Sequence, residues 1–538
     1  MLTAYMLNSF TQMKNQGFSI SFYLNKIPKH IRQAQCKQVR DDAAIGIMFK
    51  LILKVMKKRA NLIALFFILL LAAFTRMYRM YDLAVFLADQ AYDSTAVLNI
   101  IRGKLTLLGP ITSVGGFHFG PVVYYLMVPF FLILRGDPIS GTVFQTSLSL
   151  ATIPLLYILG KRLKNEVVGL VASFLFAISP LMIDYSRASF NPVPLIFFSS
   201  LIIFLVLRNA DRRTPTQSFL IGVLLGWAVQ MHYLAISLLL FSFFFPFFLY
   251  RKSFFISYFS FLITGFLIGV SPFLMFEMRH DFLNTRLFLT YLFSAKESAR
   301  SIGYALSIWP EVAGKLFDGG NNILGMGFLL LIGSSAVFIW MKKLIRRKLL
   351  VPYFLLFVLV LSVALLFGRR MPPHYVISFH MSLFLLLALS IYFILKKNIK
   401  LIMVVCFILL VINIPSWNIT KEKHELQDGL SIADFKITAR IIRKDRKGKY
   451  NVGMHAEGDN RAMPLRYTLL LLDEHPEPYT NYSDIDILYF LVKKKESPDA
   501  LKMWEYTTFG PSITLKKWEI NREYYLYKFG KSQSLAES

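Results

Sequence analysis

The sequence has very little cysteine. Only Cys36 and Cys406 occur in a chain of 538 residues. Two cysteines exclude a disulfide framework and a metal site built from cysteine. Acidic residues are also scarce: Asp and Glu number 32 against 60 Lys and Arg, which gives a formal charge of +28. Such a basic excess is typical either of nucleic-acid binding or of a membrane protein with basic cytoplasmic loops.

Hydrophobic residues decide between these two classes. They make up 55% of the chain, and 50 of the residues are Phe. A soluble domain has too little interior to bury so much apolar surface, so the composition predicts a polytopic α-helical membrane protein. Most basic residues lie in short runs between apolar segments, as the positive-inside rule requires of cytoplasmic loops. We therefore predict contact with membrane lipids and no binding to nucleic acid.

Apolar segments of about 20 residues are long enough to cross a membrane. Basic residues precede the first such segment and follow each even-numbered one, which places these loops in the cytoplasm. The chain is therefore predicted to be a multi-pass protein of the inner or plasma membrane, with its N-terminus cytoplasmic and its C-terminal region extracytoplasmic. About 11 transmembrane helices are expected, over residues 60–78, 141–160, 166–184, 192–207, 217–232, 233–250, 254–275, 322–341, 349–367, 375–395 and 400–416.

Residues 120–135 are apolar but are left out of this count. They are short for a span and carry Pro129 in the middle. A crossing here would place the basic residues at 161–164 outside the cell, against the positive-inside rule. We therefore expect a helix that lies along the outer leaflet or re-enters it.

The patterns divide the chain into three regions. Residues 1–55 are expected to form an N-terminal cytoplasmic extension without a signal peptide. Translation is predicted to start at Met48 or Met56, unless the extension is a loose appendage. Residues 56–416 form the membrane domain. Residues 417–538 are more polar and alternate strand-like runs with one helical run, which predicts a small α/β domain outside the membrane.

The stretch 86–121, between the first two spans, holds the leading candidate for catalysis. Asp89 and Asp93 are four residues apart, the spacing of neighbours on one face of a helix. A loop rich in Gly, Pro and aromatic residues closes the stretch. Asp89 has a simpler explanation as the N-cap of a helix over 90–103. Its predicted position beside other polar clusters outside the membrane favours a catalytic role instead.

Four polar clusters are predicted to lie on the same outer face as Asp89. Their cationic groups suit a phosphate ligand, although a lone Arg or His at a membrane end more often contacts lipid headgroups. The predicted residues for donor phosphate and sugar binding are Arg187, His232, Arg279, His280, Arg370 and His374. The predicted acceptor or cavity residues are Tyr92, His118, Asn191 and Glu277.

Together these residues predict a membrane glycosyltransferase. A polyprenyl-phosphate sugar donor would lie in the membrane with its phosphate at the outer face. Arg and His side chains would stabilise the charge on the leaving phosphate. Asp89 would accept the proton of an incoming hydroxyl as general base, with Asp93 in support. The sugar stays open, and so does the acceptor, which is a glycolipid, a polymer or a protein.

The same residues resemble a known superfamily. The motif ADQAYD in the first outer loop, the segment GGFHFGPVVYYL, the run LMIDYSR and an HY-containing turn before a late span occur in that order. From about Arg59 to its C-terminus the chain resembles the GT-C glycosyltransferases that use polyprenyl-phosphate sugars, such as the protein O-mannosyltransferases and the lipid A aminoarabinose transferase. This resemblance implies inverting transfer from an undecaprenyl-phosphate-linked sugar, with Asp89 as the base.

The resemblance also bears on metal binding. Members often have an acidic residue in the loop after the third span, where this chain has Asn191. A site with two carboxylate ligands would then be incomplete. We therefore expect chemistry without a metal or other cofactor, with a divalent metal as the open alternative.

Two other classes of membrane protein are alternatives to the glycosyltransferase. A transporter or flippase of lipid-linked oligosaccharide should place polar residues near the membrane midplane. Here the spans are apolar and the polar residues gather at one face. An O-antigen polymerase or ligase should carry its catalytic loop late in the chain. The early position of Asp89 therefore favours the glycosyltransferase over both alternatives.

Overall fold

The computed structural model describes residues 59–112, 115–248, 252–294, 302–346, 349–366, 372–456, 459–497 and 502–532. The chain divides into two units, Met1–Ala64 and Leu65–Ser538. The predicted N-terminal extension and Arg370 lie outside the described residues. All contacts reported below belong to the second unit.

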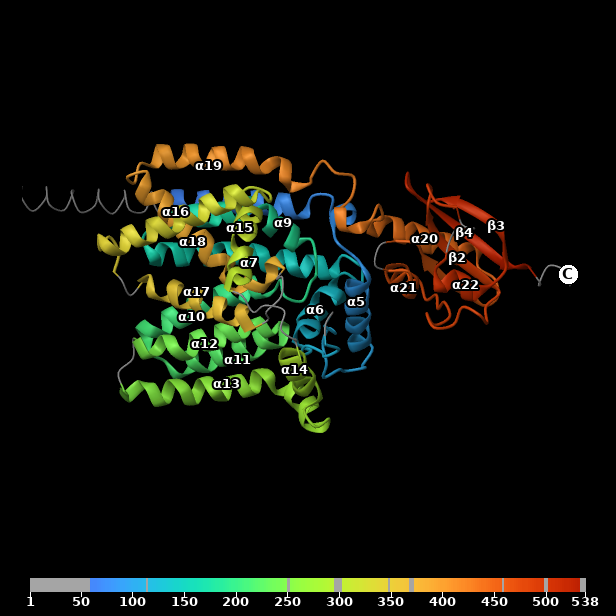
Figure 1. The fold of residues 1–538 in the computed structure, drawn as a ribbon, viewed down its shortest axis with the longest axis horizontal. Helices are drawn as coiled ribbons and strands as arrows, with labels where there is room; N and C mark the ends of the chain where they lie inside the picture. The colour runs from blue at the N-terminus through green and yellow to red at the C-terminus, as the bar shows by residue number, and fades with distance from the viewer. Residues whose placement is uncertain are drawn as a thin grey trace, which may run out of the picture. The chain divides into compact units, whose positions relative to one another are not determined.

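Helices make up most of the chain up to residue 417 (Figure 1). The first described helix is Arg59–Met77. The α-helices that follow are α4 Met80–Leu83, α5 Ala88–Ile101, α6 Val122–Ile133, α7 Ser140–Leu163, α8 Glu166–Ile178, α9 Pro180–Ser186, α10 Leu195–Arg212, α11 Pro215–Met231, α12 Ile236–Phe244, α13 Lys252–Arg279, α14 Leu283–Ser294, α15 Ile302–Phe317, α16 Asn322–Met341, α17 Val351–Leu366, α18 Ile377–Ile394 and α19 Ile399–Asn413. Short 3-10 helices are η1 Tyr233–Ala235, η2 Phe245–Phe248, η4 Pro373–Val376, η5 Ile414–Trp417 and η6 Glu425–Gln427.

Several of these helices are suited to a membrane. Among the described residues, six are long and apolar enough to cross it, or seven if the bent pair α8 and α9 counts as one span. The other predicted spans fall on α10, α11, α12 and α17, which are shorter or more polar. The chain is therefore a multi-pass membrane protein. The number of 11 spans and the orientation of the termini stay predictions.

Glycines bring α11 and α13 into close contact. Gly222 and Gly226 on α11 meet Gly265 and Gly269 on α13, and both pairs have the four-residue spacing of small residues in packed membrane helices. A Cβ atom at any of these positions would overlap backbone atoms of the other helix. At the end of this contact the Gln230 amide donates to the Gly269 carbonyl at 2.6 Å. The two helices therefore fix the C-terminal end of α11.

The first loop contains α5, a hairpin and α6. In Figure 1, α5 runs across the direction of α13 and α19. The chain then folds back on itself, with hydrogen bonds of 2.9 Å from Gly109 N to Phe119 O and from Phe119 N to Pro110 O. Helix α6 follows with Pro129 inside it. The helix expected in residues 120–135 is thus present, and its place at the membrane surface stays a prediction.

The C-terminal residues form a four-stranded mixed sheet with helices. The strands β1 Tyr450–Met454, β2 Ile487–Lys493, β3 Ser512–Glu519 and β4 Tyr524–Lys531 lie in the order β1-β2-β4-β3. Only β1 and β2 are parallel, with Val452 opposite Tyr489. The helices are α20 Ile432–Asp445, α21 Met463–Leu470 and α22 Trp504–Phe509. Sequence analysis missed α20, although Ser431 and Asp434 have the spacing of a capping box and form one here.

Polar contacts hold the C-terminal region beside the first loop. Lys436 on α20 pairs with Asp137 at 2.6 Å. The Gln427 amide donates to the Ala84 carbonyl, just before α5, also at 2.6 Å. Helix α21 packs against α5 as well. Lys436 and Asp137 are 299 positions apart in the sequence, and Gln427 and Ala84 are 343 apart, so the fold brings distant segments to the first loop.

Candidate active site

Asp89 lies in the first turn of α5 but does not cap it. Leu87 is the N-cap residue, and its own N–H donates to the Gln90 Oε1 at 2.9 Å. The Asp89 carboxylate forms no hydrogen bond or ion pair within the described part of the chain. The surrounding protein raises the pKa of Asp89 by desolvation. Helix capping therefore does not account for this carboxylate, which is left available to a ligand.

Asp89 borders a cavity of about 310 Å³, here called the histidine cavity. Its lining also includes Asn191, His232 and His374. Four residues predicted from four separate stretches of the sequence therefore surround one cavity. Among the described residues, no Lys or Arg lines it. The two histidines are its basic side chains.

The two histidines are held by similar local structures. His232 ends α11 and directly precedes η1, and His374 lies in η4. The His232 Nδ1 accepts the Leu234 N–H at 3.3 Å, so the neutral ring carries its proton on Nε2. The ring centroids of His232 and His374 are 5.9 Å apart. Both rings can therefore reach one ligand.

Aromatic rings form a large part of the cavity wall. Tyr233 stacks on Phe288 with a centroid distance of 4.7 Å. Phe117, from the hairpin, packs against these two rings at 5.5 and 5.6 Å. An apolar wall with a few polar groups is typical of a small-molecule site. Sequence analysis did not predict these residues, although the motif GGFHFGP and the Tyr after each of the two histidines were visible signals.

The hairpin is fixed against the end of α11. Gly120 N donates to the Gln230 carbonyl at 3.1 Å, and a Cβ atom at Gly120 would overlap the Gln230 side chain. His118 stabilises the same hairpin, since its Nδ1 lies 3.0 Å from the Gly109 carbonyl. Its own carbonyl accepts the Tyr233 hydroxyl at 2.9 Å. The His118 ring does not line the histidine cavity.

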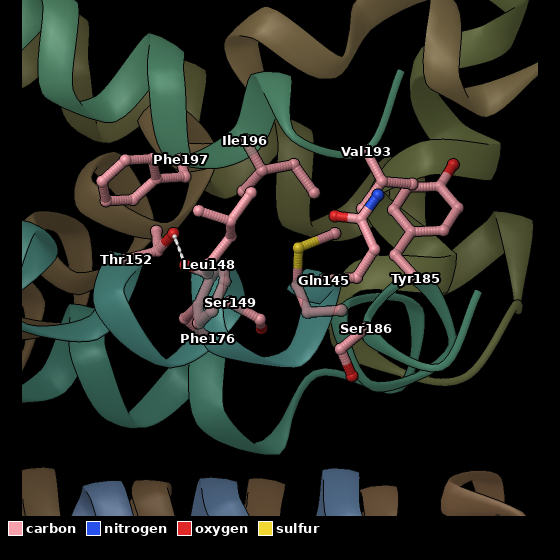
Figure 2. A pocket seen from close by; sticks show the side chains of 11 residues that line it. Gln145, Leu148, Ser149, Thr152, Phe176, Tyr185, Ser186, Val193, Ile196 and Phe197 are labelled. Atoms are coloured by element: carbon pink, nitrogen blue, oxygen red, sulfur yellow. Dashed lines mark hydrogen bonds between the residues drawn. The ribbon is translucent and has the colours of Figure 1, made fainter. Parts of the chain in front are cut away.

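Asn191 reaches the histidine cavity from the turn between α9 and α10. The Gln145 amide holds this turn by donating to the Phe190 carbonyl at 3.0 Å. Gln145 also lines a second, much smaller pocket, whose side chains are shown in Figure 2. That pocket has about 10 Å³, room for about one water molecule. Tyr185 and Val193 line both spaces, so the small pocket adjoins the histidine cavity. Its volume is small beside the 310 Å³ of that cavity.

Asp93 lies one turn after Asp89 but is buried, with 7% of its surface exposed. Its Oδ1 accepts the Tyr124 hydroxyl at 2.7 Å. Burial raises the pKa of Asp93 to about 7; the Tyr124 hydrogen bond opposes this rise, and the Asp89 charge adds to it. Asp93 therefore contacts α6 rather than the cavity. Its expected role as a support of Asp89 stays a prediction.

Replacing Asp93 with Asn should change how stability depends on pH. Between the ordinary pKa of 3.8 and about 7, folded Asp93 keeps a proton that the unfolded chain has lost. Its contribution to stability is therefore present at low pH and is lost as the pH rises through about 7. We expect the melting temperature to fall less between pH 5 and pH 8 in Asp93→Asn than in the wild type. Equal falls in both proteins would contradict a proton on Asp93.

Two predicted site residues have structural contacts away from the cavity. Arg187 is fully buried and donates to the Trp417 carbonyl at 3.1 Å and to the Thr75 carbonyl at 2.6 Å. The Glu277 Oε1 accepts from the Asn284 backbone N–H and side-chain amide at 3.1 and 3.0 Å. Arg187 thus joins distant segments, and Glu277 fixes the start of α14. Neither lines the histidine cavity.

Three further predicted residues lie on exposed surface. Arg279 and His280 are exposed at the end of α13, where the His280 ring stacks on Phe276 with a centroid distance of 4.0 Å. Tyr92 is exposed and forms a hydrogen bond with Arg461 of the C-terminal region. None of the three lines the histidine cavity.

The site is predicted to work without a metal ion. In the described ranges, no group of three or more His, Cys, Asp or Glu side chains is arranged to hold a metal ion. Asp89 borders the histidine cavity, whereas Asp93 accepts a hydrogen bond from Tyr124. Independence from metal stays a prediction.

Known proteins share this architecture. Residues 118–276 match the family model described as dolichyl-phosphate-mannose-protein mannosyltransferase. The structure of ArnT from Cupriavidus metallidurans bound to undecaprenyl phosphate is similar with a TM-score of 0.57 and 11% identity, over 88% of this chain and 97% of ArnT. The chain has the GT-C fold. The resemblance predicted from the sequence is thereby confirmed.

A second GT-C structure agrees with the first. It is the archaeal oligosaccharyltransferase AglB from Archaeoglobus fulgidus, in complex with an inhibitory peptide and a dolichol-phosphate. AglB has a TM-score of 0.53 and 12% identity, over 81% of this chain and 70% of its own. No curated protein sequence matches the chain significantly. At these identities the likeness establishes the GT-C fold, and the activity has to be argued from the site.

Proposed function

We propose that the protein is a membrane glycosyltransferase that moves a sugar from a polyprenyl-phosphate donor to an extracytoplasmic hydroxyl acceptor. The observation that carries this proposal is the position of Asp89. Its carboxylate has no structural partner among the described residues and borders the cavity that also holds His232 and His374. The GT-C fold, shared with proteins bound to undecaprenyl phosphate and dolichol-phosphate, supports the donor class.

The donor binds in the histidine cavity. The sugar lies against the aromatic wall of Phe117, Tyr233 and Phe288, and the polyprenyl chain extends into the membrane. The Nε2–H of His232 and the ring of His374 bind the phosphate. A hydrogen bond that strengthens as negative charge develops on a leaving oxygen stabilises the transition state more than the ground state. The histidines therefore assist departure of the phosphate.

Transfer proceeds in one displacement. Asp89 accepts the proton of the acceptor hydroxyl. The hydroxyl oxygen attacks the anomeric carbon, and the bond from that carbon to the phosphate oxygen breaks. The bonding electrons leave with the polyprenyl phosphate, so charge and atoms balance. Attack opposite the leaving phosphate inverts the configuration at the anomeric carbon.

The test is a transfer assay with the full-length protein in lipid vesicles. Synthetic polyprenyl-phosphate hexoses and pentoses serve as donors, and short alkyl glycosides and hydroxylated peptides serve as acceptors. We expect release of polyprenyl phosphate and a product whose anomeric configuration, read by NMR, is opposite to that of the donor. Retained configuration would refute the single displacement. No release of polyprenyl phosphate from any donor would refute the enzyme class.

A further inference from the structure

A second cavity meets Asp89 from the side of the C-terminal region. It has about 160 Å³ and is here called the carboxylate cavity. It is lined by Leu87 and Asp89 at the start of α5, and by Gln427, Asp428 and Asp459 from the C-terminal region. Asp89 is the residue that lines both this cavity and the histidine cavity. A molecule in either space can therefore contact the same carboxylate.

Gln427 leaves one polar atom unsatisfied at this cavity. Its side chain is buried, with 2% of its surface exposed. The Nε2 donates to the Ala84 carbonyl at 2.6 Å, which fixes the amide orientation. The Oε1 has no hydrogen-bond partner among the described residues. A buried oxygen without a partner is costly, and a ligand that donates a hydrogen bond would remove that cost.

The polar lining of the carboxylate cavity consists of acceptors. Asp89 can accept a ligand hydrogen, and Gln427 lines the same space with an Oε1 that is buried without a partner among the described residues. Asp459 accepts the Met463 N–H through Oδ2 at 2.9 Å and also accepts the Arg461 N–H, so backbone donors hold this carboxylate at the cavity wall. Asp428 is neutralised by Lys493 at 2.7 Å. Within the described residues no Lys or Arg lines the space.

Apolar side chains make up the rest of this lining. Phe435, Met454, Leu430 and Pro464 contribute, together with Leu87. The space therefore combines an apolar wall with several separate hydrogen-bond acceptors. A sugar ring has the complementary surface, because it carries C–H faces and hydroxyl donors around its edge. A single serine or threonine side chain offers one hydroxyl only.

We propose that the carboxylate cavity is the acceptor subsite, and that the acceptor is an uncharged sugar rather than a phosphorylated one. This inference rests on the proposed function, since it uses Asp89 as the shared base. The acceptor hydroxyl enters from the C-terminal region and meets the donor at Asp89. A phosphate group here would lie beside Asp89 and Asp459 with no cation in the described lining, and like charges repel. The acidic lining therefore selects against anionic acceptors.

The inference is tested by acceptor kinetics of the full-length protein in vesicles. The probes are octyl glucoside, its 6-phosphate and a serine-containing peptide, each with the same polyprenyl-phosphate donor. We expect octyl glucoside to be glycosylated and its 6-phosphate to react at least tenfold more slowly. Faster reaction of the phosphorylated probe or of the peptide would overturn the proposal.

Variants of the cavity separate acceptor binding from chemistry. Gln427→Met removes the unsatisfied oxygen at similar volume, together with the Nε2 hydrogen bond to the Ala84 carbonyl, and we expect it to raise the KM for octyl glucoside about tenfold. The KM for the donor and the slow transfer to water should not change. Gln217→Met is the matched control, because Gln217 also has an unpartnered Oε1 among the described residues and lines neither cavity. Asp459→Asn, which retains an oxygen for the Met463 N–H, is a second variant with the same expectation.

The outcomes distinguish two kinds of failure. If the wild type releases no sugar from any donor, the proposed function fails. If the wild type releases sugar but both cavity variants keep its KM for octyl glucoside, the proposed acceptor subsite is refuted. The proposed glycosyltransferase function is then retained. Melting temperatures of the variants, compared with the wild type, show whether a loss reflects folding instead. The comparison of octyl glucoside with its 6-phosphate uses the wild type alone and tests the subsite even if neither variant folds.

Discussion

Asp89→Asn is expected to lower the rate of sugar transfer by about 10²- to 10⁴-fold, the usual contribution of a positioned general base. Asn has nearly the same shape as Asp but cannot take up the proton of the acceptor hydroxyl. Asp89 forms no hydrogen bond within the described chain, so its replacement should leave the melting temperature almost unchanged. The measurement is transfer from a polyprenyl-phosphate donor in vesicles, with binding of the donor measured separately.

The matched control is Asp484→Asn. Asp484 pairs with Lys449 on exposed surface at 3.3 Å and lines neither cavity. Its variant should transfer sugar at the wild-type rate.

In the wild type, the rate should rise with pH as Asp89 ionises. This rise should occur at higher pH than is usual for a carboxyl group, because the surroundings raise the pKa of Asp89. Full activity of Asp89→Asn would assign the base to another residue.

Two substitutions of His232 should differ sharply in effect. Gln can place its amide N–H near the position of the histidine Nε2, whereas Asn can only replace the Nδ1 that accepts the Leu234 N–H. If the Nε2–H stabilises the leaving phosphate, His232→Asn should lower the rate about 10²-fold, the usual cost of one such donor. His232→Gln should retain a larger part of the activity. The measurement is the rate of polyprenyl phosphate release at saturating donor.

The control for this pair is a histidine outside the cavity. His280 is exposed and stacks on Phe276, and His280→Asn should leave the rate unchanged. Equal losses in His232→Asn and His232→Gln would instead point to the shape of the ring, through its contact with Phe119 at a centroid distance of 5.1 Å. A small loss in both would remove the phosphate contact from the mechanism.

Much of the candidate site follows from local sequence patterns. Apolar segments and basic loops predict that Asp89, Asn191, His232 and His374 lie at ends of helices on one face of the membrane domain, and all four line the histidine cavity. Hydrophobicity is read residue by residue, so it predicts depth along the membrane normal. It does not predict rotation about a helix axis. That is why Arg187, at the same expected depth, turned out to be buried against Thr75 and Trp417.

The C-terminal region shows the other limit. Alternating patterns in the sequence predicted its strands, but no pattern predicted that it contributes residues to the site. Gln427 meets the Ala84 carbonyl across 343 positions of sequence, and no local pattern marks the partner of so distant a contact. The carboxylate cavity exists only because α20 and α21 pack against the first loop. Its acceptor groups therefore belong to the tertiary structure alone.

The sequence by itself determined the class of protein, the GT-C resemblance and the choice of Asp89, because composition, charge asymmetry and motif order need no knowledge of packing. Tertiary structure decided which side chains share a cavity with that carboxylate. It removed the capping explanation, because Leu87 is the N-cap residue, and it placed His232 and His374 with their ring centroids 5.9 Å apart. It also placed Asp89 between two cavities. Helix α5 runs across the direction of α13 and α19, and residues of the C-terminal region line a cavity at its N-terminal end.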